Sequence, residues 1–302
     1  MKIYAPKYFS KFKCIANKCK HSCCIGWEID IDPLTMNKYA SMSNSYSKNI
    51  NESIMHTYQP HFSLNEFNKC PHLNENGLCN IIINCGEEYI CDICREHPRF
   101  YNFTNQGKEV GVGMSCEAAC SLILSFDDFD EIIEIDSNND YNDTYEYDSL
   151  SERKTVYEIL KDNTLTIDEK VEKLSNRYNI DWKSINIIDV ISNLEYLYDE
   201  HRQLISNIKT IEWNICISAE LTRILAYFVY RHTSEACSYD DFCVSLAFSI
   251  LCTGIISTLS NKDTINDIAR ILSEEIEYSQ DNIDSIKSIF DSNIYGDLYE
   301  DY

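Results

Sequence analysis

The pattern of apolar and polar positions predicts helices through the second half of the chain. Apolar side chains recur at helical spacing from Ile185 to Ile208 and again from Ile211 to Val229. Thr166 and Glu169 form a capping-box pattern, which predicts the start of a helix that runs to Tyr178. Only 8 Gly and 5 Pro are present. This scarcity also favours long helices over a loop-rich sandwich.

The most apolar segment is the stretch from Phe242 to Leu259, which contains no charged residue. Its length is marginal for a membrane span. The Ser, Thr and Gly residues within it and the acidic residues before it favour a buried central helix. We therefore expect no membrane partner.

The first half of the chain has few long periodic runs and most of the cysteines. Eleven of the 15 Cys lie between Cys14 and Cys120, on short connecting segments. Such a region is better organised around a metal than around a large apolar core. The four later cysteines lie singly in apolar stretches, where we expect small core residues: Cys216, Cys237, Cys243 and Cys252. The expected fold is mainly α, with a Cys-rich, metal-organised N-terminal region bearing short strands and a helical C-terminal domain.

The charges divide the chain in the same way. Residues 1–126 carry 12 Lys and Arg against 12 Asp and Glu, whereas residues 127–302 carry 14 against 37. Residues 127–150 contain ten acids and no base, so we interpret them as an acidic, mobile linker with a short strand from Glu131 to Ile135. The expected domains are 1–126, 127–150 and 151–302. An acidic body repels phosphate backbones, so nucleic acid is not expected as a partner.

Fifteen cysteines favour either a disulfide framework or a thiolate metal site. Residues 1–13 contain no apolar signal segment, so we expect a cytoplasmic, reducing location in which the thiols bind metal. Thiolate sulfur binds iron–sulfur clusters and zinc strongly, and short spacings let one loop present two sulfurs. The cysteines form three groups: Cys14, Cys19, Cys23 and Cys24; then Cys70, Cys79, Cys91 and Cys94; then Cys116 and Cys120.

Cys23 and Cys24 are adjacent, and neighbouring side chains of an extended backbone point in opposite directions. The pair is therefore not expected to bind one ion together. More than four cysteines are present, so either two centres exist or several cysteines are structural. The Asn76-Gly77 pair predicts a tight turn that brings Cys70 close to Cys79.

Other residues near the cysteines leave alternatives open. Arg95 and Arg99 can bind the carboxylate of a cofactor or form salt bridges with nearby acids. His21 and His72 can replace a thiolate or stay outside the ligand set. Pro98 is expected to end any helix begun at Cys94. The single G-x-G, residues 111–113, is interpreted as a loop or strand end and not as a cofactor loop.

At these motifs the sequence resembles the flagellin lysine-N-methylase family, part of a wider group with a Cys-x-x-Cys-x-x-Cys-Cys signature. The resemblance covers about residues 1–125. It rests on Phe12-x-Cys14, Cys19-x3-Cys23-Cys24-x-Gly26-Trp27, Leu73-Asn-Glu-Asn-Gly77-Leu-Cys79, Cys91-x2-Cys94-x3-Pro98-Arg99 and Ser115-Cys116-Glu-Ala-Ala119. A looser match follows at Arg223-Ile-Leu-Ala-Tyr-Phe and at Arg231-His232.

The resemblance implies S-adenosylmethionine-dependent methylation of lysine amines on flagellin, with an iron–sulfur cluster of the four-iron type (4Fe-4S). Zinc is the other metal considered. The cysteines that match the family are Cys14, Cys19, Cys23, Cys24, Cys70, Cys79, Cys91, Cys94 and Cys116, whereas Cys85 and Cys120 are additions. The chain lacks a radical-type Cys-x3-Cys-x2-Cys spacing and the Gly-rich turn of the usual methyltransferases. The alternative hypothesis is a non-enzymatic zinc- or iron-binding module that docks a partner.

Overall fold

The computed structural model describes residues 2–137 and 147–296. Contacts divide the chain into two compact units. Unit 1 consists of residues 1–12, 100–115 and 119–302, and unit 2 consists of residues 13–99 and 116–118. The domain ranges expected from composition, 1–126, 127–150 and 151–302, follow the distribution of cysteines and acids along the sequence. They do not coincide with the two units, which are defined by contacts. Residues 138–146 of the expected linker lie outside the described residues.

The described residues contain thirteen α-helices and seven strands of two to six residues, which confirms the mainly α class. In unit 1 a four-stranded sheet has the order β5-β6-β1-β7. Its strands are β1 (Lys2–Pro6), β5 (Arg99–Thr104), β6 (Gly107–Val112) and β7 (Ile132–Ser137). β1 pairs parallel with β6 and antiparallel with β7. The short strand expected near Glu131 is thus present as β7.

Two glycines shape the β5–β6 hairpin. Gly107 has a φ of +144°, and a Cβ there would lie 2.3 Å from the carbonyl oxygen of Lys2. A Cβ on Gly111 would lie 2.2 Å from the ring of Phe100. Gly111 therefore serves close packing within β6, which agrees with the interpretation of residues 111–113 as a strand end.

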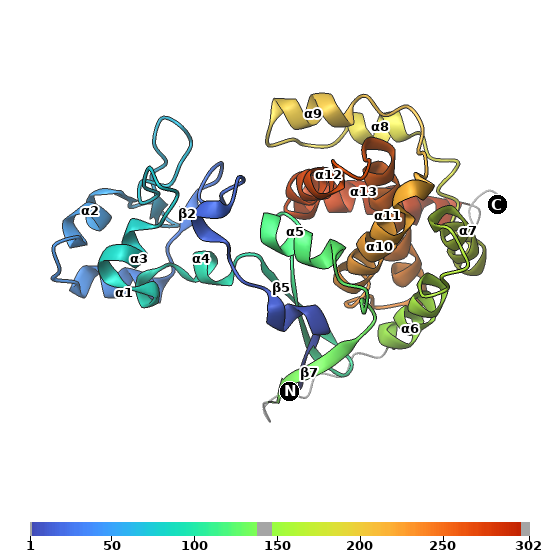
Figure 1. Ribbon diagram of the computed structural model, residues 1–302, viewed down its shortest axis with the longest axis horizontal. Coiled ribbons are helices and arrows are strands. Elements are labelled where there is room, and N and C mark those ends of the chain that lie inside the picture. The colour runs from blue at the N-terminus through green and yellow to red at the C-terminus, as the bar shows by residue number, and fades with distance from the viewer. Residues whose placement is uncertain (1, 138–146, 297–302) are drawn as a thin grey trace. The chain divides into compact units, whose positions relative to one another are not determined.

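The helices of unit 1 pack mainly around α11 (Tyr239–Leu259), which contacts α10, α12 and α13 (Figure 1). The remaining helices are α5 (Glu117–Leu124), α6 (Ser149–Leu160), α7 (Ile167–Tyr178), α8 (Ile187–Ser192), α9 (Asp199–Ile205), α10 (Ser218–His232), α12 (Ile265–Leu272) and α13 (Gln280–Gly296). A π-helical turn, Ser273–Glu277, follows α12. The predicted capping box is confirmed, because the Thr166 N–H donates to the Glu169 carboxylate over 2.8 Å at the start of α7.

Helix α11 is long and apolar enough to cross a membrane by length and composition, but 89% of its most apolar window is buried inside the protein. Two of its hydroxyl groups bond to carbonyls of the helix itself. Ser249 donates to the Ser245 carbonyl over 2.8 Å, and Thr253 donates to the Ser249 carbonyl over 2.7 Å. The expectation of a buried central helix is confirmed.

The helical run expected from Ile185 to Ile208 is wrong in its continuity, because it consists of two short helices, α8 and α9. Between them the Glu195 N–H donates to the Asn282 amide oxygen over 2.8 Å, and the Leu197 N–H donates to the Glu275 carboxylate over 2.7 Å. These tertiary partners replace the helical ones. The second expected run, from Ile211 to Val229, is also helical over only part of its length, since α10 begins at Ser218.

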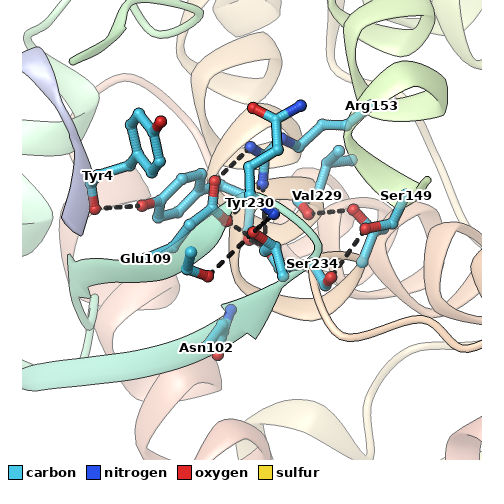
Figure 2. A network of polar contacts seen from close by, with 12 residues as sticks. Tyr4, Asn102, Glu109, Ser149, Arg153, Val229, Tyr230 and Ser234 are labelled. Atoms are coloured by element: carbon cyan, nitrogen blue, oxygen red, sulfur yellow. Dashed lines mark hydrogen bonds and ion pairs between the residues drawn. The ribbon is translucent and has the colours of Figure 1, made fainter. Parts of the chain in front are cut away.

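A buried ion pair joins the sheet of unit 1 to its helices. Figure 2 shows Glu109 of β6 facing Arg153 of α6, with two contacts of 2.5 and 2.7 Å. Ser234 donates to Glu109 over 2.7 Å and accepts from Arg153 over 2.9 Å. The Tyr230 hydroxyl bonds the Val110 carbonyl over 3.1 Å. Because both charges and their remaining hydrogen-bonding groups are satisfied, the buried pair is tolerated.

A second buried carboxylate, Glu277 of the π-helical turn, lies among donors. It contacts His232 Nε2 over 2.8 Å, the Tyr227 hydroxyl over 3.0 Å and Arg231 Nε over 3.2 Å. Burial lowers the pKa of His232, and the bond to Glu277 offsets this effect only in part. The resulting pKa is about 4, so the imidazole is neutral. For Glu277 burial acts to raise the pKa, but Arg231 and then His232 outweigh it, and the pKa lies below its ordinary value.

Unit 2 is built from short elements around a small core. They are β2 (Ile29–Asp30), α1 (Pro33–Ser41), α2 (Ser47–Glu52), β3 (Ile54–Met55), β4 (His61–Phe62), α3 (Asn80–Cys85) and α4 (Asp92–Glu96). The three strands form an antiparallel sheet of order β2-β4-β3. Helix α4 ends before His97 and Pro98, as expected. The fully buried core residues are Ile29, Ile31, Tyr39, Ile50, Ile54, Phe62, Cys70, Ile81 and Cys91.

The first prediction concerns the buried ion pair of unit 1. We expect Arg153→Ala to lower the free energy of unfolding by about 3–5 kcal/mol, because Glu109 is left as an uncompensated buried charge. Urea unfolding of the full chain measures this. Lys183→Ala is the control, since the Lys183–Glu172 pair is more than half exposed and contributes little. Equal effects of the two substitutions would contradict the assignment.

The second prediction is acid sensitivity through His232. Its pKa is about 4 when folded and near 6.5 when unfolded, so the unfolded chain binds more protons between these values. Stability is therefore fully present above about pH 6.5 and falls as pH drops towards 4. His232→Gln keeps an N–H donor for Glu277 without titrating. We expect unfolding free energies measured across this range to fall less steeply in the variant, and parallel curves would refute the claim.

Candidate metal centre

The cysteines of unit 2 are the chemically distinctive side chains of the protein. All fifteen cysteines lie among the described residues, and each is a free thiol. The structure therefore gives no support to a disulfide framework. Ten cysteines belong to unit 2, namely Cys85 and the nine that match the family: Cys14, Cys19, Cys23, Cys24, Cys70, Cys79, Cys91, Cys94 and Cys116.

The other five cysteines belong to unit 1. Cys120 is buried in α5 and lies 3.4 Å from the Asn266 carbonyl oxygen, to which it donates. Cys243 and Cys252 are buried in α11, as expected. The same expectation is wrong for Cys216 and Cys237, which are exposed. Cys216 lies in the short 3-10 helix Ile215–Ile217, and Cys237 lies between α10 and α11.

Six cysteines lie in or pack against the hydrophobic core of unit 2. Cys85 is one of them, and we call the other five, which match the resembled family, the inner group: Cys24, Cys70, Cys79, Cys91 and Cys94. Cys79 and Cys91 are the residues that precede α3 and α4, respectively, and Cys94 lies in the first turn of α4. Short helices thus start at cysteines. This arrangement places sulfurs at the positive ends of two helices, where thiolates are favoured.

Backbone pairing brings the inner group together from distant parts of the chain. The Cys70 N–H donates to the Cys24 carbonyl over 2.8 Å. Cys79 pairs with Leu73 in an isolated antiparallel bridge, and the turn between them contains Gly77 at φ +71°. The turn expected at Asn76-Gly77, and with it the approach of Cys70 to Cys79, is confirmed.

The sulfurs of the inner group influence one another electrostatically. Burial, together with the smaller effects of the nearby sulfurs of Cys24, Cys79 and Cys91, raises the pKa of Cys70 to about 12. A hydrogen bond from Cys94 lowers the pKa of Cys91 and raises that of Cys94 itself. Without a cation, the five thiols therefore cannot all be ionised at the same time. A bound metal ion would remove that penalty, because thiolates bind metal in the ionised form.

Four further cysteines form a separate set, which we call the outer group: Cys14, Cys19, Cys23 and Cys116. The Cys19 sulfur lies 3.2 Å from the His21 carbonyl and 3.6 Å from the Glu117 carboxylate, next to Cys116. Glu117 also accepts from the Lys20 N–H over 2.8 Å. Cys14 and Cys23 are exposed, whereas Cys19 and Cys116 are half-buried.

Cys23 and Cys24 form the junction between the two groups. The sulfurs of Cys116 and Cys14 in the outer group contribute to a raised pKa of Cys23. Cys24, in contrast, packs against the hydrophobic core of unit 2. The Cys23 thiol donates to the Cys24 sulfur, which is the largest reason why the pKa of Cys24 is lowered to about 7 and that of Cys23 is raised.

Among the described residues, no three His, Cys, Asp or Glu side chains are already arranged so that they could hold one metal ion. A metal-organised region is therefore not shown, and the metal ligands stay a prediction. The donor chemistry nevertheless fits thiophilic metals, because both groups consist of sulfur from short loops and helix starts. Loading a metal would require the sulfurs to move closer together.

The other candidates have protein partners. His72 is buried, and its two ring nitrogens lie 3.0 Å from the Tyr46 hydroxyl and 2.9 Å from the Ser53 hydroxyl. Arg95 forms an ion pair with Asp92 and donates to the Ile90 carbonyl over 2.9 Å.

Arg99 donates to the Arg95 carbonyl over 3.0 Å. His21 contributes its carbonyl to Cys19. None of these contacts tests the predicted roles of the arginines in binding a cofactor.

Three supporting residues were missed by the sequence analysis. The Tyr39 hydroxyl donates to the Tyr89 carbonyl over 2.7 Å and lies 3.7 Å from the Cys91 sulfur. Asp32 caps α1 and accepts from the Asp92 N–H over 2.9 Å, which fixes the start of α4. The Asp-Pro pair before α1 is a helix-start signal that could have identified Asp32. Glu117 could have been noticed as the acid that follows Cys116.

Comparison with known proteins gives partial relatives. The chain is 23% identical over 127 residues to a protein named lysine-N-methylase from Salmonella typhimurium, and this match covers 40% of the chain and 32% of the relative. It is 24% identical over 127 residues to the flagellar biosynthetic protein FliU of Salmonella muenchen, covering 75% of that protein. The chain thus spans about a third of the length of the lysine-N-methylases. These matches confirm the predicted resemblance to their family. No family model matches, and no solved structure matches.

The third prediction contrasts the two cysteines at the ends of α3. Cys79 belongs to the inner group, whereas the Cys85 sulfur accepts from the Asn44 amide over 3.2 Å and packs beside Met42. We expect Cys79→Ser to lose at least half of the metal bound per chain and Cys85→Ser to keep all of it. Elemental analysis of anaerobically purified protein measures this. A full metal content in Cys79→Ser would remove Cys79 from the ligand set.

Proposed function

We propose that this chain, a partial relative of the lysine-N-methylases, is a cytoplasmic protein-lysine N-methyltransferase that uses S-adenosylmethionine and acts on flagellin. The observation that carries the proposal is the similarity to proteins named lysine-N-methylase over 40% of the chain. The similarity to FliU supports a flagellar substrate. The nine family cysteines, all in unit 2, support a metal requirement.

The inner group is the place in unit 2 that best fits an iron–sulfur cluster. It offers five sulfurs, of which Cys70 and Cys91 are buried and the other three are partly buried, and limited access of water protects a cluster and tunes its potential. A four-iron cluster held there by these cysteines would supply a Lewis acid for the amino and carboxylate groups of S-adenosylmethionine. Arg95 and Arg99, on and just after α4, would assist by binding the carboxylate, with Arg95 exchanging its Asp92 partner for it.

The transfer itself requires a neutral amine. A free lysine has a pKa of about 10.4, so the site must disfavour the ammonium form by burial. The amine nitrogen attacks the sulfonium methyl carbon, the carbon–sulfur bond breaks to leave a thioether, and the methylated ammonium then releases a proton. A carboxylate or a tyrosine of the chain accepts that proton.

A second candidate function is favoured by one observation. The single G-x-G lies at the end of β6, where Gly111 packs against Phe100, so these glycines do not form a cofactor loop. A chain without such a loop also suits a non-enzymatic module that binds zinc or iron through its cysteines and docks a partner. Metal identity and cofactor binding separate the two functions.

The fourth prediction tests the proposed activity. Anaerobically purified protein is expected to be brown, to contain iron and sulfide, and to transfer labelled methyl groups to lysines of co-expressed flagellin. Cys91→Ser with Cys94→Ser should lower both bound iron and methyl transfer at least tenfold, because two sulfurs of the inner group are lost. Cys85→Ser is the matched control and should retain both.

Two outcomes would decide against the enzyme. Iron-loaded protein that leaves flagellin lysines unmethylated would contradict the methyltransferase. Colourless protein that contains only zinc and does not bind S-adenosylmethionine would favour the docking module.

A further inference from the structure

We propose that the outer edge of strand β7 in unit 1 is a docking site for an extended, lysine-bearing segment of a partner protein, which adds to the sheet as a further strand. Identifying that partner as the protein substrate rests on the proposed function, whereas the site itself is built only from residues of unit 1. Addition of a strand to an exposed sheet edge is a recurring mode of peptide recognition, in which main-chain hydrogen bonds supply affinity and alternate side chains supply specificity.

Strand β7 is the last strand of the four-stranded sheet in spatial order. The order β5-β6-β1-β7 ends there, and β7 pairs antiparallel with β1. No other strand among the described residues pairs with β7. Its outer side therefore presents the row of backbone N–H and C=O groups that a sheet edge offers to an incoming strand.

The two faces of β7 differ in chemistry. Tyr4 of β1 is paired with Glu109 of β6 and with Glu134 of β7, so the three side chains lie on one face of the sheet. Figure 2 shows Tyr4 and Glu109 close together on this face. Ile133 is paired with Ala5, the next residue along β1, and thus lies on the opposite face, where it is 39% exposed. A strand added to β7 therefore meets a carboxylate on one face and an isoleucine on the other.

A cavity of about 690 Å³ lies beside the start of β7, on the face that carries Tyr4. Ile132 and Asp130 line it together with Tyr4, and α6 contributes Tyr157 and Glu158 to its wall. The cavity has room for a lysine side chain whose methylene groups contact the rings and whose ammonium group lies among carboxylates. Because Ile132 belongs to the wall, a strand paired with β7 can place a side chain inside the cavity.

An excess of negative charge along this edge favours a basic partner. Residues 127–137 contain six acids and no Lys or Arg. Among the described residues, five of these acids pair with only four bases from other segments, which are Lys2, Lys7, Lys161 and Arg223. The sixth acid, Asp136, accepts from the Ser137 N–H over 2.7 Å. The three lysines are 42–57% exposed, so their ion pairs are weak and exchange readily for an incoming lysine.

The wall of the cavity carries an excess of the same sign. Four acids line it against three bases: Glu109, Asp130, Asp148 and Glu158 against Arg153, Lys154 and Lys161. Two of the bases are already neutralised, because Arg153 is paired with Glu109 and Lys161 with Asp130. A cationic side chain is therefore accepted more readily than an anionic one.

The same charges decide between possible partners. Two copies of β7 in contact would place acids of both chains opposite each other, and like charges in that position destabilise a strand pair. Charged edges of this kind are a protection against self-association. A segment that alternates lysine with β-branched residues satisfies both faces, because the lysines meet Glu134 and the cavity while the β-branched side chains meet Ile133.

The fifth prediction tests this docking site. A fluorescently labelled peptide, Thr-Lys-Val-Lys-Val-Lys-Thr, is expected to bind the anaerobically purified full-length protein in an anisotropy titration at low salt. Glu134→Gln with Asp136→Asn removes two charges of the edge, keeps the side-chain shapes and should weaken binding by about fivefold or more. The matched control is Asp168→Asn with Glu172→Gln on α7, which should leave the affinity unchanged. Glu172, like Glu134, is paired with an exposed lysine.

Two further peptides separate strand pairing from simple attraction of opposite charges. Replacing both valines by proline keeps the net charge but removes N–H donors, and it should abolish binding. Replacing the lysines by glutamates should abolish binding as well. Equal binding of the valine and proline peptides, or equal weakening by the β7 and α7 substitutions, would overturn the proposal, because charge alone would then account for the affinity.

Amide hydrogen exchange followed by mass spectrometry provides an independent measurement. Bound peptide should slow the exchange of β7 amides and leave the exchange of α7 amides unchanged, because only the outer edge of the sheet gains hydrogen-bond partners. Unchanged exchange in β7 at saturating peptide would also overturn the docking site. Neither measurement involves methyl transfer, so failure of the proposed function and failure of the docking site are observed separately.

Discussion

The constraint that dominates unit 2 is the cost of placing several ionisable sulfurs close together. Its core consists of five isoleucines, Tyr39 and Phe62 together with Cys70 and Cys91, and further cysteines pack against it. Neutral thiols tolerate this packing, but thiolates do not, since burial and neighbouring sulfurs raise the pKa of Cys70. A cation is the chemical partner that makes ionisation favourable. Folding of unit 2 and metal loading are therefore expected to be coupled.

Unit 1 also buries ionisable groups. Its buried charges are paired inside the fold, as in Glu109 with Arg153 and Glu277 with Arg231. Each carboxylate also accepts a hydrogen bond from a hydroxyl group, from Ser234 or Tyr227. Aromatic rings lie against both guanidinium groups, with Arg153 5.0 Å from the ring centre of Tyr230 and Arg231 4.7 Å from that of Phe100. The two units thus differ in their buried ionisable groups, because unit 1 buries ion pairs whereas the core of unit 2 contains the thiols of Cys70 and Cys91.

Local signals predicted much of this structure. The capping box before α7, the buried character of α11 and the turn at Asn76-Gly77 all follow from short-range patterns and are confirmed. The break between α8 and α9 was not predictable, because it is caused by Asn282 and Glu275, which lie about 80 residues further along the chain. The same limit applies to the cysteines. The family resemblance identified the nine candidates, but the separation into inner and outer groups arises from contacts such as Cys19 with Glu117 across 98 residues.

The same chemistry constrains where such a protein can work. Cys14 and Cys23 are exposed, and the pKa of Cys24 is lowered to about 7, mainly by its bond from Cys23. A partly ionised sulfur next to another thiol is readily oxidised, and adjacent cysteines that are oxidised can no longer bind metal. A reducing compartment keeps the sulfurs competent until metal arrives, and bound metal then protects them. This dependence supports the proposed cytoplasmic location, and it also means that oxygen exposure during purification would remove bound metal and the proposed activity together.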